Sequence, residues 1–405
     1  MIEADSRRDR DGSGLGPNLE REQGSYTTGE PGTLFVITAG MHGNEPSGIL
    51  AARRVLRQLE SQSLPMRGRI VVLAGNLSSL TLGVRYVQQD LNRMWSEEAV
   101  AEVLSRAPEE LRYEDRDQRE LIGIIESLLI GERAEKWEHV VFLDLHSTSG
   151  AGPPFTIVGD TIQNRRVAFE FGIPAILGLE ENVHGTLLGF LGTRGYAAVG
   201  IEGGQHDEAS TIDNHEAAIW LTLVSMDMLW PREIPELERH RVCLAAAASG
   251  TPPVVELRYR HGLEEDEEFE MVPGLTNFLP VQAGRLLARS QRRGEAPAEV
   301  TCPEDGILLL PRYQGQGLDG FFIGRTVDPR WLALSAWLRK LKLDSMLTRL
   351  PGVSRPDGAP GQLRVNQRIA RWLTLQLFHL MGYRRRRSEG RYMIFEKRVE
   401  RPPES

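Results

Sequence analysis

Between residues 33 and 229, short apolar runs alternate with segments of helical spacing, and this alternation constrains the fold most. The runs are rich in Val, Ile, Leu and Phe and have no polar face, which is typical of strands buried on both sides of a sheet. Such strands belong to mostly parallel or mixed sheets with helices on both faces. The sequence therefore predicts an α/β fold, with strands at 33–38, 68–74, 140–145, 155–158, 175–179 and 197–201 and helices within 47–58, 99–130 and 214–229.

Changes in pattern divide the chain into four segments. Residues 1–32 are charged and aperiodic and are expected to form a flexible tail, followed by the α/β domain at 33–250. Residues 251–325 contain alternating segments and turn signals, which predict a smaller, mainly β second domain. Residues 326–382 return to helical spacing, interrupted by a Pro- and Gly-rich break at 351–361. A helical C-terminal extension is therefore expected over 326–405, with one short strand at 391–395 and a surface for packing or for a homo-oligomer.

Composition narrows the partners and the compartment. The formal net charge of -8 opposes non-specific binding to nucleic acid, because a polyanion would be repelled. The two cysteines, Cys243 and Cys302, are too few for a disulfide framework, which fits a reducing compartment. The first 30 residues lack the apolar core of a secretory signal, and no window approaches the ~20 apolar residues of a membrane span. A cytoplasmic protein without membrane or nucleic-acid partners is expected.

Two histidines and a glutamate stand where two of the apolar runs end. His42 and Glu45 lie three residues apart in the motif GMHGNE, and His146 ends the run VVFLDLH. Two nitrogens and one carboxylate form the open ligand set of hydrolytic zinc sites, which leaves a coordination position for water or substrate. Taken singly, a histidine in a loop after a strand, such as His42, is more often a structural hydrogen-bonding residue than a ligand, and His146 is equally compatible with a satisfied core histidine.

Glu202 ends a third apolar run, before two glycines. Ligands of open α/β sheets sit beyond the C-terminal ends of the strands, so Glu202 is expected on the same rim as the two histidines and Glu45. A buried carboxylate is costly unless it is paired or functional, and burial raises its pKa toward the range useful for proton transfer. His184 and His206 lie near loops of this rim and are weaker candidates for contacts with the substrate or the ligands.

With these residues, the sequence resembles the succinylglutamate desuccinylase/aspartoacylase family, a branch of the zinc carboxypeptidase-like hydrolases. The resemblance covers roughly residues 33–325 and rests on four motifs in family order: GMHGNE at 40–45, RYVQQDLNR at 85–93, DLHST at 144–148 and GIEGG at 200–204. The tail and the C-terminal extension lie outside it.

The resemblance implies that His42, Glu45 and His146 bind one Zn²⁺ per chain. Glu202 would act as general base toward a metal-activated water and then as acid toward the departing amine. Arg85 would polarise the scissile carbonyl and stabilise the oxyanion, a role whose removal typically costs on the order of a hundred- to a thousandfold in rate.

The resemblance also implies that Asn92 and Arg93 hold a substrate carboxylate, for which a guanidinium is well shaped. Asp90 is interpreted as a support for their loop. Tyr313, in the second domain, is a candidate hydrogen-bond donor to the substrate, although core packing is the simpler interpretation. Arg194 is a candidate for binding a second substrate carboxylate, but its spacing from Glu202 does not match that of the equivalent arginine in the family.

Three functions remain open from the sequence. The first is a zinc-dependent amidohydrolase that cleaves a small N-acyl amino acid or a related carboxylate, with Glu202 as the general base. The second is a metallocarboxypeptidase acting on peptides, against which stands a second domain expected to crowd out long chains. The third is a non-catalytic metabolite-binding relative, which would be expected to have lost a ligand, Glu202 or Arg85.

Overall fold

The computed structural model describes residues 15, 19–129, 137–264, 266–341, 343–356, 359, 361–366, 369 and 378–400. An eleven-stranded sheet organises most of this chain, with the order β1-β3-β2-β4-β7-β5-β6-β8-β14-β13-β10. Its first seven strands are β1 (Glu22–Thr27), β2 (Glu30–Ala39), β3 (Arg67–Ala74), β4 (Val140–Thr148), β5 (Phe155–Val158), β6 (Ala175–Leu177) and β7 (Ala197–Gln205). Strands β3, β2, β4 and β7 are parallel, while β1 pairs antiparallel with β3, and β5 pairs antiparallel with β7 and parallel with β6. The predicted mixed α/β sheet is confirmed.

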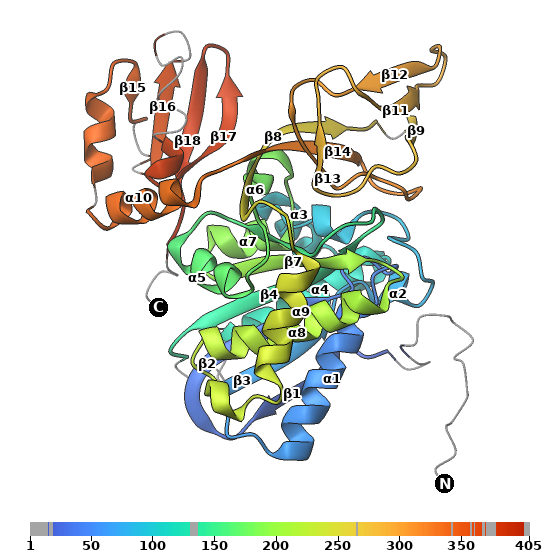
Figure 1. Ribbon diagram of the computed structural model, residues 1–405, viewed down its shortest axis with the longest axis vertical. Coiled ribbons are helices and arrows are strands. Elements are labelled where there is room, and N and C mark those ends of the chain that lie inside the picture. The colour runs from blue at the N-terminus through green and yellow to red at the C-terminus, as the bar shows by residue number, and fades with distance from the viewer. Residues whose placement is uncertain are drawn as a thin grey trace.

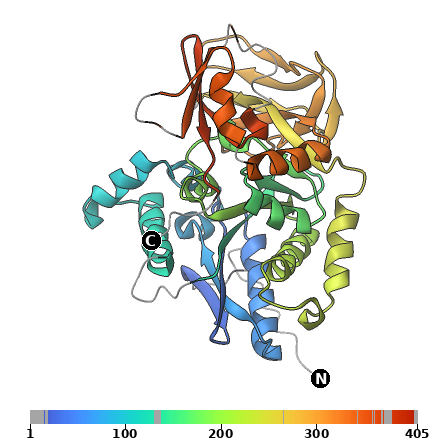
Figure 2. The same cartoon turned by 90° about the vertical axis from the view of Figure 1, so that its left-hand side faces the viewer.

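Helices cover both faces of this sheet (Figures 1 and 2). Side chains alternate along β2, so that Phe35 and Ile37 join one core cluster while Leu34 and Val36 join the other. The first cluster is completed mainly by α1 (Ser47–Gln62), α5 (Ile162–Glu170) and α8 (Ala209–Ser225), with α9 (Leu237–Ala247) outside α8. The second is completed by α3 (Glu97–Ser105), α4 (Glu114–Leu129) and α7 (Leu187–Thr193). None of the helices described is long and apolar enough to cross a membrane.

The second domain continues the main sheet rather than standing apart from it. Strands β8 (Val254–Gly262), β14 (Asp319–Thr326), β13 (Gly306–Leu309) and β10 (Leu279–Val281) extend the sheet, because β8 pairs parallel with β6 and covers its open edge. A separate three-stranded sheet is formed by β12 (Ala298–Thr301), β11 (Leu286–Gln291) and β9 (Glu268–Met271). The mainly β character was expected, but the shared sheet was not.

The N-terminal segment is more ordered than the sequence indicated. Most of residues 1–18 lie outside the described residues, but β1 pairs antiparallel with β3. Arg21 is buried beside it, and its guanidinium contacts Asp117 and donates a hydrogen bond to the carbonyl of Ala74 at 2.6 Å. The predicted flexible tail is therefore wrong for residues 22–32. Strand pairing and a buried ion pair hold this segment in place, whereas its composition indicated only that it is polar.

The predicted helical C-terminal extension is correct only at its start. After α10 (Pro329–Lys340) and the short 3-10 helix η4 (Leu343–Arg349), a four-stranded antiparallel sheet follows, in the order β15-β16-β18-β17. These strands are β15 (Val353–Ser354), β16 (Gln362–Asn366), β17 (Tyr383–Glu389) and β18 (Tyr392–Lys397), so the strand expected at 391–395 is present. Leu363, Val365 and Phe395 project into one small core, which is the period-two pattern of a sheet. Together α10, η4 and β15–β18 are called the C-terminal domain below.

Buried ion pairs dock the C-terminal domain against the α/β domain. Arg398, after β18, pairs with Glu180 at 2.7 Å and with Glu181 at 3.2 Å. Arg339 of α10 pairs with Asp160 at 2.7 Å. Burial opposes ionisation of Asp160, yet its arginine neighbours hold its pKa below the ordinary range. The charges at this junction are therefore matched and fixed.

Removing the cation of this junction is expected to destabilise the protein. Arg398→Ala would remove the cation that pairs with Glu180 and would leave Glu181 with His379 alone, and we expect the free energy of unfolding to fall by about 3–5 kcal/mol. Urea unfolding followed by tryptophan fluorescence measures this, since Trp331 and Trp337 lie on α10. The matched control is Arg391→Ala, an exposed arginine of the same domain, which should change stability by less than about 0.5 kcal/mol. Equal stabilities for the two variants would contradict the docking role.

Candidate active site

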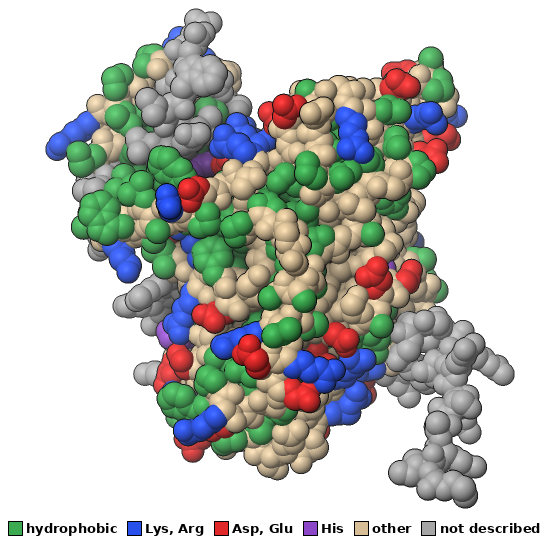
Figure 3. Space-filling model, in the orientation of Figure 1, with side chains coloured by type: hydrophobic (Ala, Val, Ile, Leu, Met, Phe, Trp, Pro, Cys, Tyr) green, Lys and Arg blue, Asp and Glu red, His purple; other side chains and the backbone are tan. Residues whose placement is uncertain are grey.

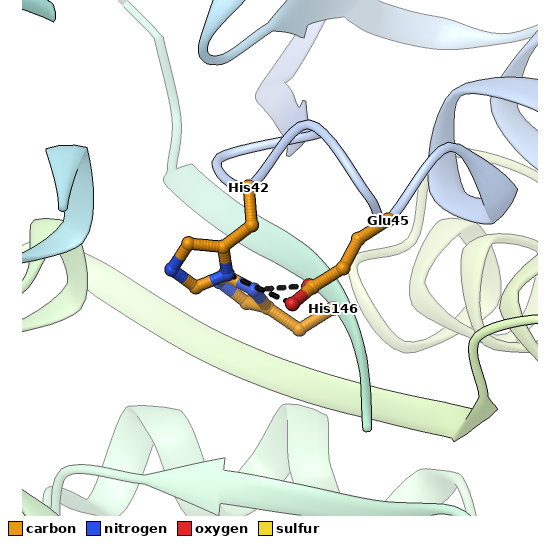
Figure 4. A group of neighbouring side chains, drawn as sticks. All are labelled: His42, Glu45 and His146. Carbon is orange, nitrogen blue, oxygen red and sulfur yellow. Dashed lines mark hydrogen bonds and ion pairs between the residues drawn. The ribbon is translucent and has the colours of Figure 1, made fainter. Parts of the chain in front are cut away.

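His42, Glu45 and His146 converge at the C-terminal ends of neighbouring strands. His42 and Glu45 occupy the loop between β2 and α1, and His146 lies on β4, which pairs parallel with β2 (Figure 4). The Nδ1 atoms of His42 and His146 lie 2.9 and 3.0 Å from the two carboxylate oxygens of Glu45. Gly43 allows this turn, because a Cβ there would lie 2.1 Å from the backbone of Ser79. All three side chains are buried.

The arrangement fits a divalent metal ion. One ligand atom from each of the three residues lies within 4.8 Å of the others. The opposite ring nitrogens are held by carboxylates, with His42 Nε2 3.1 Å from Asp90 and His146 Nε2 2.9 Å from Asp144. A carboxylate on the far nitrogen is the usual means of fixing the ring orientation of a ligating imidazole. Both Nδ1 atoms are thereby directed toward Glu45.

The charges of the site favour a cation at its centre. Burial opposes ionisation of Glu45, yet His42 and His146 hold its pKa well below the ordinary range. Burial also opposes a charge on His146, but Asp144 and Glu45 raise the pKa of its imidazole well above the usual value. The surrounding carboxylates therefore provide a strongly negative potential that either protonated imidazole or a metal ion can neutralise.

Glu202 and Arg85 lie beside these three residues, and each has a buried polar atom without a hydrogen-bond partner among the residues described. Glu202 is on β7, opposite His146 in the register, and only 8% of it is exposed. Burial raises the pKa of its carboxyl to about 8, and its Oε2 has no hydrogen-bond partner among the residues described. Arg85 lies 3.4 Å from Glu45 and 3.1 Å from Asp90, and within the same set of residues its buried Nε is unpartnered. An acid and a cation are thus available beside the candidate metal position.

The loop that carries Arg85 is fixed from two sides by residues that the sequence analysis missed. Glu114, at the start of α4, accepts hydrogen bonds from the backbone of Val87 at 2.6 Å and of Gln88 at 3.2 Å. Gln316, from the second domain, accepts from the backbone of Arg85 at 3.1 Å. The acidic residues in the first turn of α4 are a sequence signal for a helix start alone, and no sequence signal points to Gln316.

The comparison with family models adds independent evidence. The model described as the succinylglutamate desuccinylase/aspartoacylase catalytic domain matches residues 31–220. Residues 31–220 form a catalytic domain of this family. The match includes every member of the site except the contacts from the second domain, and it leaves the C-terminal domain unmatched.

Curated relatives align with this chain over short stretches. The succinylglutamate desuccinylase of Pseudomonas syringae pv. tomato is 40% identical over 65 residues, which are 16% of this chain and 19% of the relative. The enzyme of the same name from Burkholderia orbicola is 32% identical over 82 residues, 20% of this chain and 24% of the relative. The matches therefore span about a fifth to a quarter of these relatives.

Solved structures share the fold over a longer range. A succinylglutamate desuccinylase/aspartoacylase from Rhodobacter sphaeroides superimposes with a TM-score of 0.52 and 17% identity, covering 75% of this chain and 87% of that one. The product-bound ectoine utilization protein EutE (DoeB) from Ruegeria pomeroyi gives 0.52 and 17%, covering 75% and 88%. At this identity the likeness concerns the fold alone.

Asn92 and Arg93 of the desuccinylase/aspartoacylase domain line the site but are engaged by the protein. The side-chain oxygen of Asn92 accepts from the backbone of Leu187 at 3.0 Å, and its Nδ2 lies 3.4 Å from His146. Arg93 donates to its neighbour's carbonyl at 2.8 Å and to Asp319 at 2.6 Å. That these two residues hold a substrate carboxylate stays a prediction, and Asp319 is a partner that the sequence did not reveal.

Tyr313 and Arg194 are not brought to the site. The Tyr313 hydroxyl donates within the second domain, 2.8 Å from the carbonyl of Val272, and the side chain does not line the catalytic cavity. This placement does not support a hydrogen bond from Tyr313 to the substrate. Arg194 instead stacks on Phe190, with 3.6 Å between the guanidinium carbon and the ring centroid.

The two remaining histidines differ in their placement. His184 lines the cavity that holds the site. The Nδ1 atom of His206 lies 2.8 Å from the hydroxyl of Ser147, and its Nε2 lies 3.3 Å from Gln314. The backbone N–H of Ser147 donates to the Glu45 carboxylate at 3.1 Å. His206 therefore supports Glu45 indirectly, through Ser147.

The geometry predicts that metal binding depends on His146. In His146→Ala we expect the affinity for Zn²⁺ to fall by more than about a hundredfold, because one of three ligands is lost. Asp144→Asn, which removes only the carboxylate behind that ligand, should lose about 10- to 100-fold. Metal content after dialysis and chelator competition measure both, with the exposed His139→Ala as control. Full metal retention in His146→Ala would rule out the assignment.

The raised pKa of Glu202 predicts how the stability of the metal-free protein varies with pH. In the unfolded chain this carboxyl ionises near pH 4.5, whereas the folded protein keeps its proton to about pH 8. Between these values the folded state binds the extra proton, so the free energy of unfolding falls as pH rises, by at most about 1.4 kcal/mol per pH unit. Glu202→Gln should show a shallower decline when urea unfolding is measured in EDTA across this range. Superimposable profiles would show that the carboxyl is not perturbed.

Proposed function

We propose that this protein is a zinc-dependent hydrolase that cleaves the amide bond of a small N-acyl amino acid or a related carboxylate. The observation that carries this proposal is the placement of Glu202 and Arg85 in one cavity with His42, Glu45 and His146, where each of the two has a buried polar atom without a hydrogen-bond partner among the residues described. Membership of the desuccinylase/aspartoacylase family supports the same class of reaction.

Glu202 supplies the proton transfers. A bound Zn²⁺ supplies Lewis-acid polarisation of the carbonyl and lowers the pKa of water. The Glu202 carboxylate accepts a proton from the attacking water, whose oxygen bonds to the acyl carbon. It then returns the proton to the amide nitrogen as the C–N bond breaks, so the products are a carboxylic acid and an amine. Burial raises the pKa of the Glu202 carboxyl to about 8, against the lowering effect of His146 and Arg85, and this value suits a group that must both accept and donate a proton near neutrality.

Arg85 stabilises the charge that develops on the carbonyl oxygen. Its carboxylate partners, Glu45 and Asp90, fix the guanidinium, and the unpartnered Nε leaves it a donor for a further acceptor. Asn92 and Arg93 orient the carboxylate of the substrate in this proposal. The loop before β14 restricts access, because Pro311, Gln314 and Gln316 line the same cavity, and this favours small substrates over long peptides.

The proposal predicts the behaviour of two variants on a panel of N-acetyl and N-succinyl amino acids. Glu202→Gln should keep its metal but lose about 10²–10⁴-fold in kcat, because the proton acceptor is gone. Arg85→Ala should lose about 10²–10³-fold. Steady-state assays with metal analysis of each sample measure both.

The matched control is Glu238→Gln, an exposed glutamate of α9, which should leave turnover unchanged. Faster hydrolysis of C-terminally extended peptides than of N-acyl amino acids would favour a carboxypeptidase instead. Unchanged turnover in Glu202→Gln would refute the role of that residue, and metal binding without any hydrolysis would indicate a binding protein.

A further inference from the structure

The face of β7 that carries Glu202 continues with two small residues. Side chains alternate along a strand, and Ala197, Val199 and Ile201 join the core on one side of the sheet. Ala198 and Gly200 therefore share the other face with Glu202. Small residues at these two positions leave space next to the candidate general base.

The helix that covers this face also leaves space. Helix α7 contacts β7 and contains Gly189 and Gly192 among its seven residues. Glycine destabilises a helix relative to alanine, so a glycine at such a position needs a reason. Among the residues described, a Cβ at Gly192 would come within 4 Å of nothing beyond the backbone of its own helix, so packing does not require glycine there. Gly192 lines the catalytic cavity, and its missing side chain keeps this part of the cavity open.

The walls of this part of the cavity are apolar. A Cβ at Gly200 would lie 2.8 Å from Leu188 and 3.5 Å from Ile157, so both side chains lie over the residue two positions before Glu202. Helix α6 (Leu179–Asn182) and the turn after it complete the wall. The six apolar residues that line the cavity here are called the apolar pocket below: Ile157, Leu179, Val183, Leu188, Phe190 and Ala198.

Polar side chains along the same stretch are already engaged by the protein. The side chain of Asn164 donates to one backbone carbonyl and accepts from one backbone N–H, both at 2.9 Å. Thr186 accepts from the backbone of α7 at 3.1 Å, and Thr193 donates to it at 2.8 Å. Glu180 pairs with Arg398 at 2.7 Å. A ligand in the apolar pocket therefore meets mainly apolar surface.

The pocket does not offer the cation that the sequence suggested for a second substrate carboxylate. Arg194 stacks on the ring of Phe190 and does not line the cavity. Other charged side chains line the cavity at its metal end, on α3 and on the C-terminal domain. Burying a carboxylate against apolar residues is costly unless a partner is present, so the apolar pocket disfavours an anionic chain.

The cavity has room for more than a small N-acyl amino acid. It encloses about 810 Å³, in the upper part of the range of about 300–1,000 Å³ that accommodates drug-sized ligands. The surface is hollowed between the C-terminal domain and the second domain (Figure 3), and residues of both line the cavity. His184, an exposed residue of the turn before α7, also lines it.

We propose that the apolar pocket binds an unbranched alkyl or aryl group of the substrate, so that hydrophobic N-acyl amino acids are preferred to those whose chain ends in a second carboxylate. The scissile amide lies at the metal end, and the apolar group belongs to the acyl half or to the amino-acid side chain. Affinity then grows with the apolar area removed from water. This inference rests on the proposed deacylase function and deepens it, because it names the class of substrate.

Binding to zinc-loaded Glu202→Gln, measured by isothermal titration calorimetry, tests the pocket without turnover. One probe series extends the acyl half, from N-acetylglycine to N-octanoylglycine, with N-succinylglycine and N-suberylglycine as members that end in a carboxylate. The other extends the side chain, from N-acetyl-L-alanine to N-acetyl-L-2-aminooctanoate, with N-acetyl-L-glutamate as the charged member. In at least one series we expect binding to tighten about three- to fourfold per added CH₂ until the pocket is filled. The charged member should bind more weakly than the alkyl probe with the same number of carbon atoms.

Two variants made in the same background change the pocket by different means. Gly192→Leu fills it from α7, and Leu188→Asn places a polar group in its wall, so both should lose most of the gain with chain length. The matched control is Gly123→Leu, the same exchange at an exposed glycine of α4 that does not line the cavity, and it should keep the gain. The zinc content of each sample is measured, so that a damaged metal site is recognised.

Three results would overturn the inference. They are affinity independent of chain length in both series, tighter binding of the carboxylate-ended probes than of their alkyl counterparts, and an equal gain in Gly192→Leu and Gly123→Leu.

Turnover by the wild type separates these results from a failure of the proposed function. Hydrolysis of the short probes without any preference for long alkyl chains would leave the deacylase standing and remove the pocket's role. Binding that depends on chain length without hydrolysis of any probe would leave the pocket's role standing and remove the deacylase.

Discussion

The carboxylate of Glu45, buried between two imidazoles, is the interaction on which the rest of the site depends. A buried charge is tolerated only where its partners are held in place, and here His42 and His146 lie within 3.0 Å of its oxygens. Those imidazoles are in turn fixed by Asp90 and Asp144. Burying any one of these charged groups without its partners would destabilise the fold. The groups of the cluster therefore depend on one another and form as a unit.

The sheet supplies the rigidity that this cluster needs. Because β2, β4 and β7 are adjacent and parallel, their carboxyl ends deliver His42, His146 and Glu202 to one edge with little freedom. The second domain then returns to the same edge, since β8 continues the main sheet and pairs with β14, the strand that follows the loop of Gln316. A loop more than two hundred residues away in sequence thereby fixes the backbone of Arg85.

What the sequence could predict was what local pattern determines. The strand at Phe155–Val158 was placed to the residue, and the grouping of the His42 and His146 motifs followed from strand ends in a parallel sheet. What it missed depends on distant partners. The strand β1 is ordered by β3 and by the Arg21 ion pair, and β15–β18 share a small core whose contributors are scattered among Pro- and Gly-rich turns.

The same limit applies to Arg93. Its motif is visible in the local sequence, but the charged groups around it come from distant parts of the chain. Asp319 lies 2.6 Å from Arg93 and 2.5 Å from Arg260, so one carboxylate of the second domain already stands between two guanidinium groups. The three together keep one net positive charge. A guanidinium has five N–H donors, of which Arg93 directs one toward Asp319 and one toward the carbonyl of Asn92. Any carboxylate that Arg93 receives therefore meets donors whose direction Asp319 has set, and its recognition depends on geometry more than on an excess of charge.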